Sequence, residues 1–191
     1  MRLCHSGRPK TPLLGLLDPL CHTLSFGKRK KEVTVSNTIS FVQEQGIATL
    51  SFDNPARRNA LGATELAAID TALDALEPAT RVLVITSSDD RIFCAGADLS
   101  QILDGVISGD RFQSVTNRIA GLPIPTIAVL TGNVFGGGAE LALSCDFRIG
   151  RAGMILRIPA AAIGLGYPVE GIERLTRRRG PNLCKRLVVA A

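Results

Sequence analysis

Short runs of apolar residues that alternate with polar ones begin near residue 38 and indicate β-strands. Residues 38–43 and 47–52 are rich in β-branched and apolar side chains, and the three residues between them predict a β-hairpin. Residues 81–86 and 126–130 form more continuous apolar runs, which are typical of buried strands. Residues 146–149 are expected to form a further strand.

Longer segments with apolar residues at intervals of three and four indicate helices. Residues 64–76 carry this pattern, and Thr64 is expected to cap the helix. Residues 111–120, the small-residue run 139–144 and a segment that begins near Pro181 are also expected to be helical. Strands that alternate with loops and helices in this way predict an α/β fold.

The positive charge of the chain is concentrated at its start. The net charge is +5, but residues 1–31 hold seven Lys/Arg and one acid, which leaves 15 basic and 16 acidic side chains in the rest. With a nearly neutral body, one Tyr and no Trp, the chain is not expected to bind nucleic acid. No apolar run reaches the ~18 residues of a membrane helix, so no membrane association is expected.

One further basic group lies near the end of the chain and leaves two interpretations open. It is either a solvated helix face or a surface that contacts phosphate. Its members are Arg174, Arg177, Arg178, Arg179, Lys185 and Arg186.

The five cysteines predict no disulfide framework and no zinc site. Their number is odd and no pair has the C-x-x-C spacing. This usage fits a reducing intracellular setting, and a cytoplasmic location is expected.

Residues 1–32 differ from the remainder and are expected to lie outside the core domain of residues 33–191. They contain three prolines, both histidines and the basic run 28–31. We expect a disordered extension or a start codon placed too early. An organelle presequence is the alternative, with the mitochondrial matrix as the destination.

Two predicted loops carry candidate chemistry. Residues 93–99 follow a buried strand, and Gly136-Gly137-Gly138 lies between a strand and a helix. Glycines allow close backbone approach, and the N–H groups at a helix start are unpaired. Each loop can therefore donate one backbone N–H to a carbonyl oxygen that gains negative charge, which is an oxyanion hole. Glu140, one turn into the same helix, is a candidate acid/base.

The triple glycine and Glu140 also have other interpretations. A triple glycine can reflect tight packing of a helix on a strand, and Glu140 can be a capping residue. A nucleotide cradle is disfavoured because Leu141 occupies the last glycine position of G-x-G-x-x-G.

The two loops together resemble the signatures of the crotonase (enoyl-CoA hydratase/isomerase) superfamily. Residues 92–99 resemble its first signature and residues 132–146 its second. Residues 54–61 are similar to an early segment that lines the CoA side in the family, and residues 174–177 to a later one. The resemblance covers roughly residues 38–191.

This resemblance implies an α/β, crotonase-like (ClpP/crotonase) spiral of repeated β-β-α units. It implies that an acyl-CoA is the substrate, with no metal or redox cofactor, and that the protein forms a homo-trimer or hexamer. The backbone N–H groups of Ala97 and Gly137 would hold the thioester oxygen, and Glu140 would move protons. The substrate-binding residues would be Arg58, Ala95, Gly96, Asp98, Gly136 and Ala160.

The chain departs from the family pattern at three places. Ala160 stands where hydratases of the family have a second glutamate, and Glu170 stands where a glycine is usual. Family members also usually continue into further helices, so the core is expected to be truncated at its C-terminus. Glu170 or Glu173 could substitute, although both are expected on the surface. The resemblance thus favours an enoyl-CoA hydratase/isomerase-type enzyme, with a non-catalytic or vestigial acyl-CoA binder as the alternative.

Overall fold

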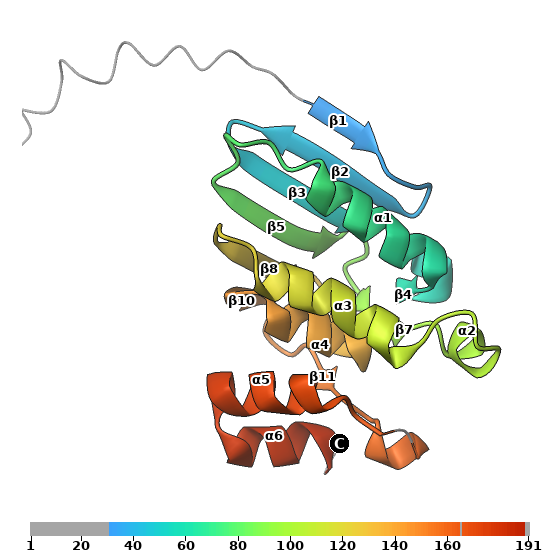
Figure 1. Ribbon diagram of the computed structural model, residues 1–191. Helices are drawn as coiled ribbons and strands as arrows, with labels where there is room; N and C mark the ends of the chain where they lie inside the picture. Colours follow the sequence, from blue (N-terminus) through green and yellow to red (C-terminus); the bar gives the residue numbers. More distant parts are fainter. Residues whose placement is uncertain (1–30, 165, 190–191) are drawn as a thin grey trace, which may run out of the picture.

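The computed structural model describes residues 31–164 and 166–189, and its largest element is a six-stranded mixed sheet (Figure 1). The first two neighbouring pairs in the sheet are antiparallel and the remaining three are parallel. In spatial order the strands are β1 (Lys31–Thr34), β2 (Ile39–Glu44), β3 (Ile47–Phe52), β5 (Val82–Ser87), β8 (Thr126–Leu130) and β10 (Phe147–Gly150).

Two smaller sheets run beside the large one. A three-stranded sheet contains β11 (Leu156–Arg157), β9 (Asn133–Phe135) and β6 (Ile92–Cys94) in parallel, and β4 (Ala60–Leu61) pairs in parallel with β7 (Gly96–Ala97). The chain therefore passes repeatedly from the large sheet to a small sheet and then to a helix. This order agrees with the expected spiral of β-β-α units.

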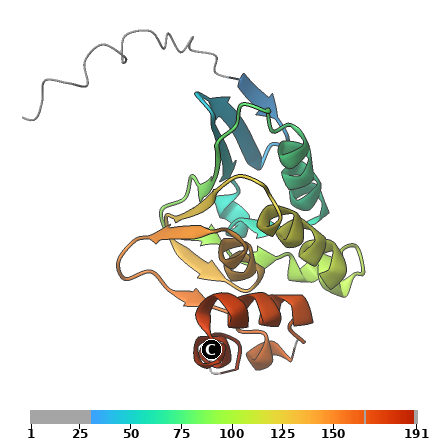
Figure 2. The same cartoon turned by 60° about the vertical axis from the view of Figure 1, so that its left-hand side comes forward.

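The helices pack on one another in chain order beside the large sheet. Figures 1 and 2 show α1 and α3 over the same face of that sheet, with α5 and α6 as a pair at one end of the molecule. The helices are α1 (Ala63–Asp74), α2 (Leu99–Leu103), α3 (Gly109–Ala120), α4 (Gly137–Ser144), α5 (Val169–Arg179) and α6 (Pro181–Val188), with short 3-10 turns η1 (Pro55–Arg57) and η2 (Ala161–Ile163).

Most of the expected elements are confirmed to within about two residues, but several details were wrong. Thr64 does not cap α1: Gly62 is the capping residue, and its N–H donates to Glu65 Oε2 at 2.9 Å. The first segment expected as a loop contains the short strands β6 and β7, and the second is the start of α4, which follows the short strand β9. The expected domain boundary after residue 32 falls inside β1, while residues 1–30 lie outside the described part of the chain.

The core lies between the large sheet and the helices. Alternate residues of β2, β3, β5 and β8 are buried, as expected of strands that turn one face to the core. Phe52 and Phe93 meet edge to face with ring centroids 5.5 Å apart, which joins the large sheet to β6. The core therefore fixes the strand that leads into the first candidate loop.

A buried asparagine ties three loops together next to this core. Asn59 has a left-handed backbone (φ 54°), and its Oδ1 accepts a hydrogen bond from the Asn54 N–H at 2.7 Å. Its Nδ2 lies 2.8 Å from Ser87 Oγ and 3.1 Å from the carbonyl oxygens of Ile92 and Phe93. The side chain thus replaces backbone pairing where β4, β5 and β6 converge.

Replacement of Asn59 with Ala is expected to lower the free energy of unfolding by about 2–3 kcal/mol, because several buried polar groups lose their partner. Urea unfolding followed by circular dichroism measures the change. Asn182→Ala is the control, since Asn182 is exposed and its loss is expected to cost no more than about 0.5 kcal/mol. Equal effects of the two substitutions would contradict the structural role of Asn59.

Candidate functional site

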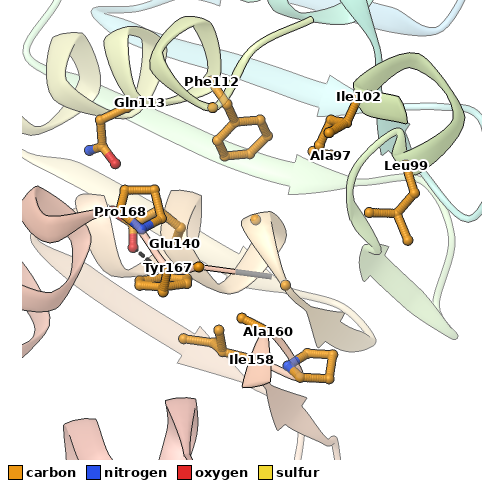
Figure 3. Close-up of a pocket in the computed structure, with 15 residues that line it drawn as sticks. Ala97, Leu99, Ile102, Phe112, Gln113, Glu140, Ile158, Ala160, Tyr167 and Pro168 are labelled. Carbon is orange, nitrogen blue, oxygen red and sulfur yellow. Dashed lines mark hydrogen bonds between the residues drawn. The ribbon is translucent and has the colours of Figure 1, made fainter. Parts of the chain in front are cut away.

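A cavity of about 210 Å³ lies where the two candidate loops meet (Figure 3). In the close-up, Ala97, Ile102 and Phe112 face Ile158 and Ala160 across it, and Glu140 lies beside Tyr167. The lining residues are Ala97, Leu99, Ile102, Gly109, Phe112, Gln113, Gly136, Gly137, Glu140, Ile158, Pro159, Ala160, Gly166, Tyr167 and Pro168. Most of these residues are apolar, and none carries a positive charge.

In strand β7, the backbone N–H of Ala97 points away from the neighbouring strand β4. The Asp98 N–H donates to the Leu61 carbonyl at 3.0 Å. Successive N–H groups of an extended strand point to opposite sides, so the Ala97 N–H points away from β4. Because Ala97 lines the cavity, this group is a candidate donor to a bound molecule.

Helix α4 begins at the same cavity. Its first residue is Gly137, and the first N–H groups of a helix have no partner within the helix. A Cβ on Gly137 would lie 3.1 Å from the Ala97 nitrogen, and one on Gly96 would lie 2.6 Å from the Gly137 nitrogen. The two backbones therefore meet without side chains between them, which brings both predicted donors together.

Glu140 is buried in the first turn of α4, with 4 % of its surface exposed. Tyr167 donates its hydroxyl hydrogen to Glu140 Oε2, and the Arg174 guanidinium forms an ion pair with Glu140 Oε1. These partners come from the segment before α5 and from α5 itself. Glu140 therefore does not cap its own helix: its carboxylate joins α4 to α5.

Other residues hold Arg174 in place. Its side chain is 12 % exposed, and its Nη1 also donates to Ser144 Oγ at 3.0 Å. Its Nη2 donates to Asn117 Oδ1 in α3. The guanidinium thus links three helices, and its position next to Glu140 is fixed from more than one side.

The remaining predicted site residues divide into two groups. Gly136 and Ala160 line the cavity, while Ala95 and Gly96 form the turn that supports Ala97. The Ala95 N–H donates to the carbonyl of Arg58 at 3.0 Å, whereas the Arg58 side chain is exposed and is not part of the lining.

Asp98 has a structural role. Its carboxylate caps α2 through the Ser100 and Gln101 N–H groups and lies 2.8 Å from the Arg57 guanidinium. The hydrogen bond from the Ser100 side chain is the main effect that lowers the pKa of Asp98. Asp98 is therefore adjacent to the site but does not line the cavity.

The basic group near the C-terminus is not a single surface. Arg177 is exposed and pairs with Glu173 at 3.6 Å, as expected of a solvated helix face. Arg178 instead donates to the carbonyl oxygens of Leu143 and Cys145 at the end of α4. With Arg174 buried against Glu140, the expectation of one common role for these residues was wrong.

Glu170 and Glu173 are exposed, as expected, and neither lines the cavity. No carboxylate other than that of Glu140 is present among the lining residues that the structure describes. The position of Ala160 in the cavity wall therefore leaves a methyl group where hydratases of the resembled family have a second glutamate.

Sequence reasoning missed Tyr167 and missed the role of Arg174. A usable signal was present in α5: Gly171, Arg174, Leu175 and Arg178 follow the i, i+3, i+4, i+7 spacing of one helix face. An arginine between a buried glycine and a buried leucine on that face requires an acceptor in the interior. Glu140, already a candidate acid/base, is the acid that could have been proposed as this acceptor.

The arrangement of groups in the site can support proton transfer beside a polarised carbonyl. Two backbone donors, one carboxylate and one phenol surround an otherwise apolar cavity. Burial raises the pKa of the Tyr167 hydroxyl far above its usual range, and the Glu140 charge raises it further, so the phenol stays protonated. Burial also raises the pKa of Cys94 to about 12, so it remains a thiol and not a nucleophile.

Residues 31–164 and 166–189 contain no helix that is long and apolar enough to cross a membrane. The same residues contain no group of three or more His, Cys, Asp or Glu side chains that could hold a metal ion. The cysteines in this part of the chain, Cys94, Cys145 and Cys184, are free, whereas Cys4 and Cys21 lie outside it.

Comparisons with known proteins identify relatives of the chain. The model of the enoyl-CoA hydratase/isomerase family matches residues 42–191. Mitochondrial methylglutaconyl-CoA hydratase of Mus musculus is 35 % identical over 156 residues, which cover 78 % of this chain and 50 % of the mouse protein. Crotonyl-CoA hydratase of Syntrophomonas wolfei is 34 % identical over 156 residues, 78 % of this chain and 60 % of that protein.

The solved structures agree with the sequence comparison. A crystal structure of an enoyl-CoA hydratase/isomerase family member superposes with a TM-score of 0.72 at 31 % identity, covering 80 % of this chain and 62 % of the other. The chain spans about half to three fifths of the length of the curated relatives it matches.

Replacement of Arg174 with Met is expected to lower the free energy of unfolding by about 3–5 kcal/mol, because it leaves the Glu140 carboxylate buried without its ion-pair partner. Addition of Glu140→Gln to this variant should recover part of the lost free energy of unfolding, since burial of a neutral amide costs less free energy than burial of an unpaired carboxylate. Urea unfolding of the wild type, both single variants and the double variant measures the coupling. Strictly additive losses would contradict the ion pair.

Proposed function

Because this chain belongs to the enoyl-CoA hydratase/isomerase family, we propose that it acts on an acyl-CoA thioester held with its carbonyl oxygen between the N–H groups of Ala97 and Gly137. The observation that carries the proposal is the meeting of these two donors with the Glu140 carboxylate in one apolar cavity. The family supplies the substrate class, and the cavity supplies the arrangement of groups that enolate chemistry needs.

The proposed reaction moves a proton along the acyl chain. The Glu140 carboxylate removes a proton from C2 of a 3-enoyl-CoA, and the electron pair passes to the thioester oxygen. The two N–H groups stabilise the resulting dienolate, which is the effect expected of preorganised donors in an apolar site. Protonation at C4 then gives the 2-enoyl-CoA.

Isomerisation is proposed over hydration because of Ala160. Hydration adds water across C2 and C3, and two carboxylates in the resembled family share that task. A methyl group at residue 160 cannot exchange a proton, and Glu140 is the sole carboxylate among the described lining residues. Transfer of a proton between C2 and C4 needs no second carboxylate.

The lining residues also favour an uncharged acyl group. Leu99, Ile102, Phe112 and Ile158 provide apolar walls, and no cationic side chain is present among the described lining residues to pair with a second carboxylate on the substrate. We therefore propose an unbranched apolar acyl chain. The exposed Arg58 is the proposed contact for the CoA phosphates, and no cofactor is needed beyond the substrate itself.

A second candidate function is binding of acyl-CoA without turnover. The specific observation in its favour is that both oxygens of Glu140 have partners within the protein, Arg174 on one and Tyr167 on the other. A base occupied in this way is less available to a substrate. Under this alternative the thioester binds in the same oxyanion hole but exchanges no C2 proton.

The cellular setting and the assembly stay predictions. The mouse relative is mitochondrial, which supports the mitochondrial alternative over the cytoplasm. A trimer or hexamer remains the expected oligomeric state, and sedimentation of the purified chain would measure it.

Replacement of Glu140 with Gln is expected to abolish isomerisation of a short-chain 3-enoyl-CoA, by at least about 1000-fold, because the amide accepts no proton. Binding of crotonyl-CoA, measured by calorimetry, should change little. Glu173→Gln is the matched control, since Glu173 is exposed and pairs only at the surface with Arg177. Full activity of the Glu140 variant would refute the assignment, and binding by the wild type without any turnover would favour the second candidate.

Replacement of Gly96 with Ala is expected to reduce turnover about 100-fold or more. The new Cβ would lie 2.6 Å from the Gly137 nitrogen, and the φ of +98° disfavours any other residue, so the two donors must move apart. Gly153→Ala is the control, because Gly153 also has a positive φ but no atom within 4 Å of its Cβ position. Equal activity of the Gly96 variant and the wild type would contradict the oxyanion hole.

A further inference from the structure

We propose that Tyr167 is the second proton-transferring group of the site, which delivers a proton to C4 while Glu140 removes one from C2. This inference rests on the proposed isomerase function and extends it to a second residue. Tyr167 is the only tyrosine of the chain, it lines the cavity, and its hydroxyl is hydrogen-bonded to the candidate base. Figure 3 shows the two side chains joined beside the cavity.

Glu140 is held in one position by α5. Its Oε1 is paired with Arg174, which Ser144 and Asn117 hold in turn. Only Oε2 is left to act on a bound acyl chain, and Oε2 is the oxygen that accepts the Tyr167 hydroxyl hydrogen. Any proton that Glu140 exchanges with the acyl chain is therefore exchanged next to the Tyr167 hydroxyl.

The fold leaves space for the phenol next to the carboxylate. Gly171 is buried in the first turn of α5, and a Cβ there would lie 2.8 Å from Tyr167 Cε1 and 2.9 Å from Glu140 Oε2. Both groups therefore occupy the space that a side chain at 171 would need. Ala160, which also lines the cavity, contributes only a methyl group.

The proposed step balances without any added reagent. Glu140 Oε2 takes the proton from C2, and the C2 electron pair forms the dienolate. The Tyr167 O–H then turns from Oε2 to C4 and breaks as a new C4–H bond forms, and the proton now on Oε2 is donated back to the phenol oxygen across the same contact. Glu140 ends as a carboxylate and Tyr167 as a phenol, so the site is restored.

The environment of Tyr167 keeps its hydroxyl protonated, as a group that donates a proton must be before the reaction. The raised pKa, due first to burial and then to the Glu140 charge, keeps the hydroxyl protonated before the reaction. Release of its proton to C4 is therefore expected only in concert with replacement from Glu140. This coupling requires the direct contact that the two side chains make.

The test compares Tyr167→Phe with the wild type on a short-chain 3-enoyl-CoA in deuterated water. Two rates are measured by NMR: exchange of the C2 hydrogens and formation of the 2-enoyl product. The variant is expected to retain C2 exchange within about threefold and to lose isomerisation by about 100-fold, the usual scale of one acid/base group. Thr86→Val, which removes a hydroxyl that does not line the cavity, is the control and should match the wild type in both rates.

A second variant tests the contact itself. Gly171→Ala is expected to separate the phenol from the carboxylate and to show the same split between retained exchange and lost isomerisation. A single turnover by the wild type should place solvent deuterium at C4, because the phenol enters the reaction already deuterated. Thermal unfolding of each variant confirms that it is folded.

Four outcomes would overturn the relay. If Tyr167→Phe isomerises the substrate at the wild-type rate, both proton transfers belong to Glu140. The same holds if the wild type transfers the original C2 hydrogen to C4. Equal losses of exchange and isomerisation in that variant would make Tyr167 a positioning residue for Glu140. Absence of both reactions in the wild type would instead overturn the proposed function, and the relay with it.

Discussion

The site depends on the contact between two stretches of backbone with no side chains between them. β7 and the start of α4 come from successive β-β-α units, and Cβ atoms at Gly96 or Gly138 would lie only 2.6 Å from the Gly137 nitrogen or 2.5 Å from the Cys94 carbonyl oxygen. Packing this close fixes the Ala97 and Gly137 N–H groups relative to one another. The large sheet, the edge-to-face Phe52 and Phe93 rings and the hydrogen bonds of Asn59 all hold the first stretch in register. The second stretch is fixed because β9 leads directly into α4.

A second constraint is the buried ion pair of Glu140 with Arg174. Charges are costly to bury, and a pair of this kind contributes more to fixing one arrangement than to net stability. Here it joins α4 to α5, and with Asn117 it includes α3. The same interaction that holds the last helices against the site also orients the carboxylate. The partners that make burial of the carboxylate tolerable are therefore also those that fix its orientation beside the cavity.

The strands and helices with strong periodic patterns could be predicted from local sequence, and β2, β3, β5, β8 and α3 lie where expected. Short elements such as β6, β7 and β9 could not, because two or three residues carry no measurable period and are strands only through their neighbours. The cap of α1 was misplaced for a similar reason. A glutamate three residues after a glycine can satisfy the helix start without a hydroxyl side chain.

The sequence by itself determined the glycine loops, the single carboxylate at their junction and, through its resemblance, the family and the fold. These features are local, because the absence of side chains in a run of glycines, or of a carboxylate at Ala160, depends only on the residue type and not on tertiary contacts. Only the tertiary structure decided the surroundings of Glu140. Tyr167 and Arg174 lie 27 and 34 residues further along the chain. Contact with Glu140 depends on how α5 packs on α4. The face pattern of α5 indicates a buried arginine, but it does not specify which residue pairs with it. The sequence left two interpretations open for Arg174 and gave none for Tyr167. The tertiary structure shows that both side chains are partners of Glu140.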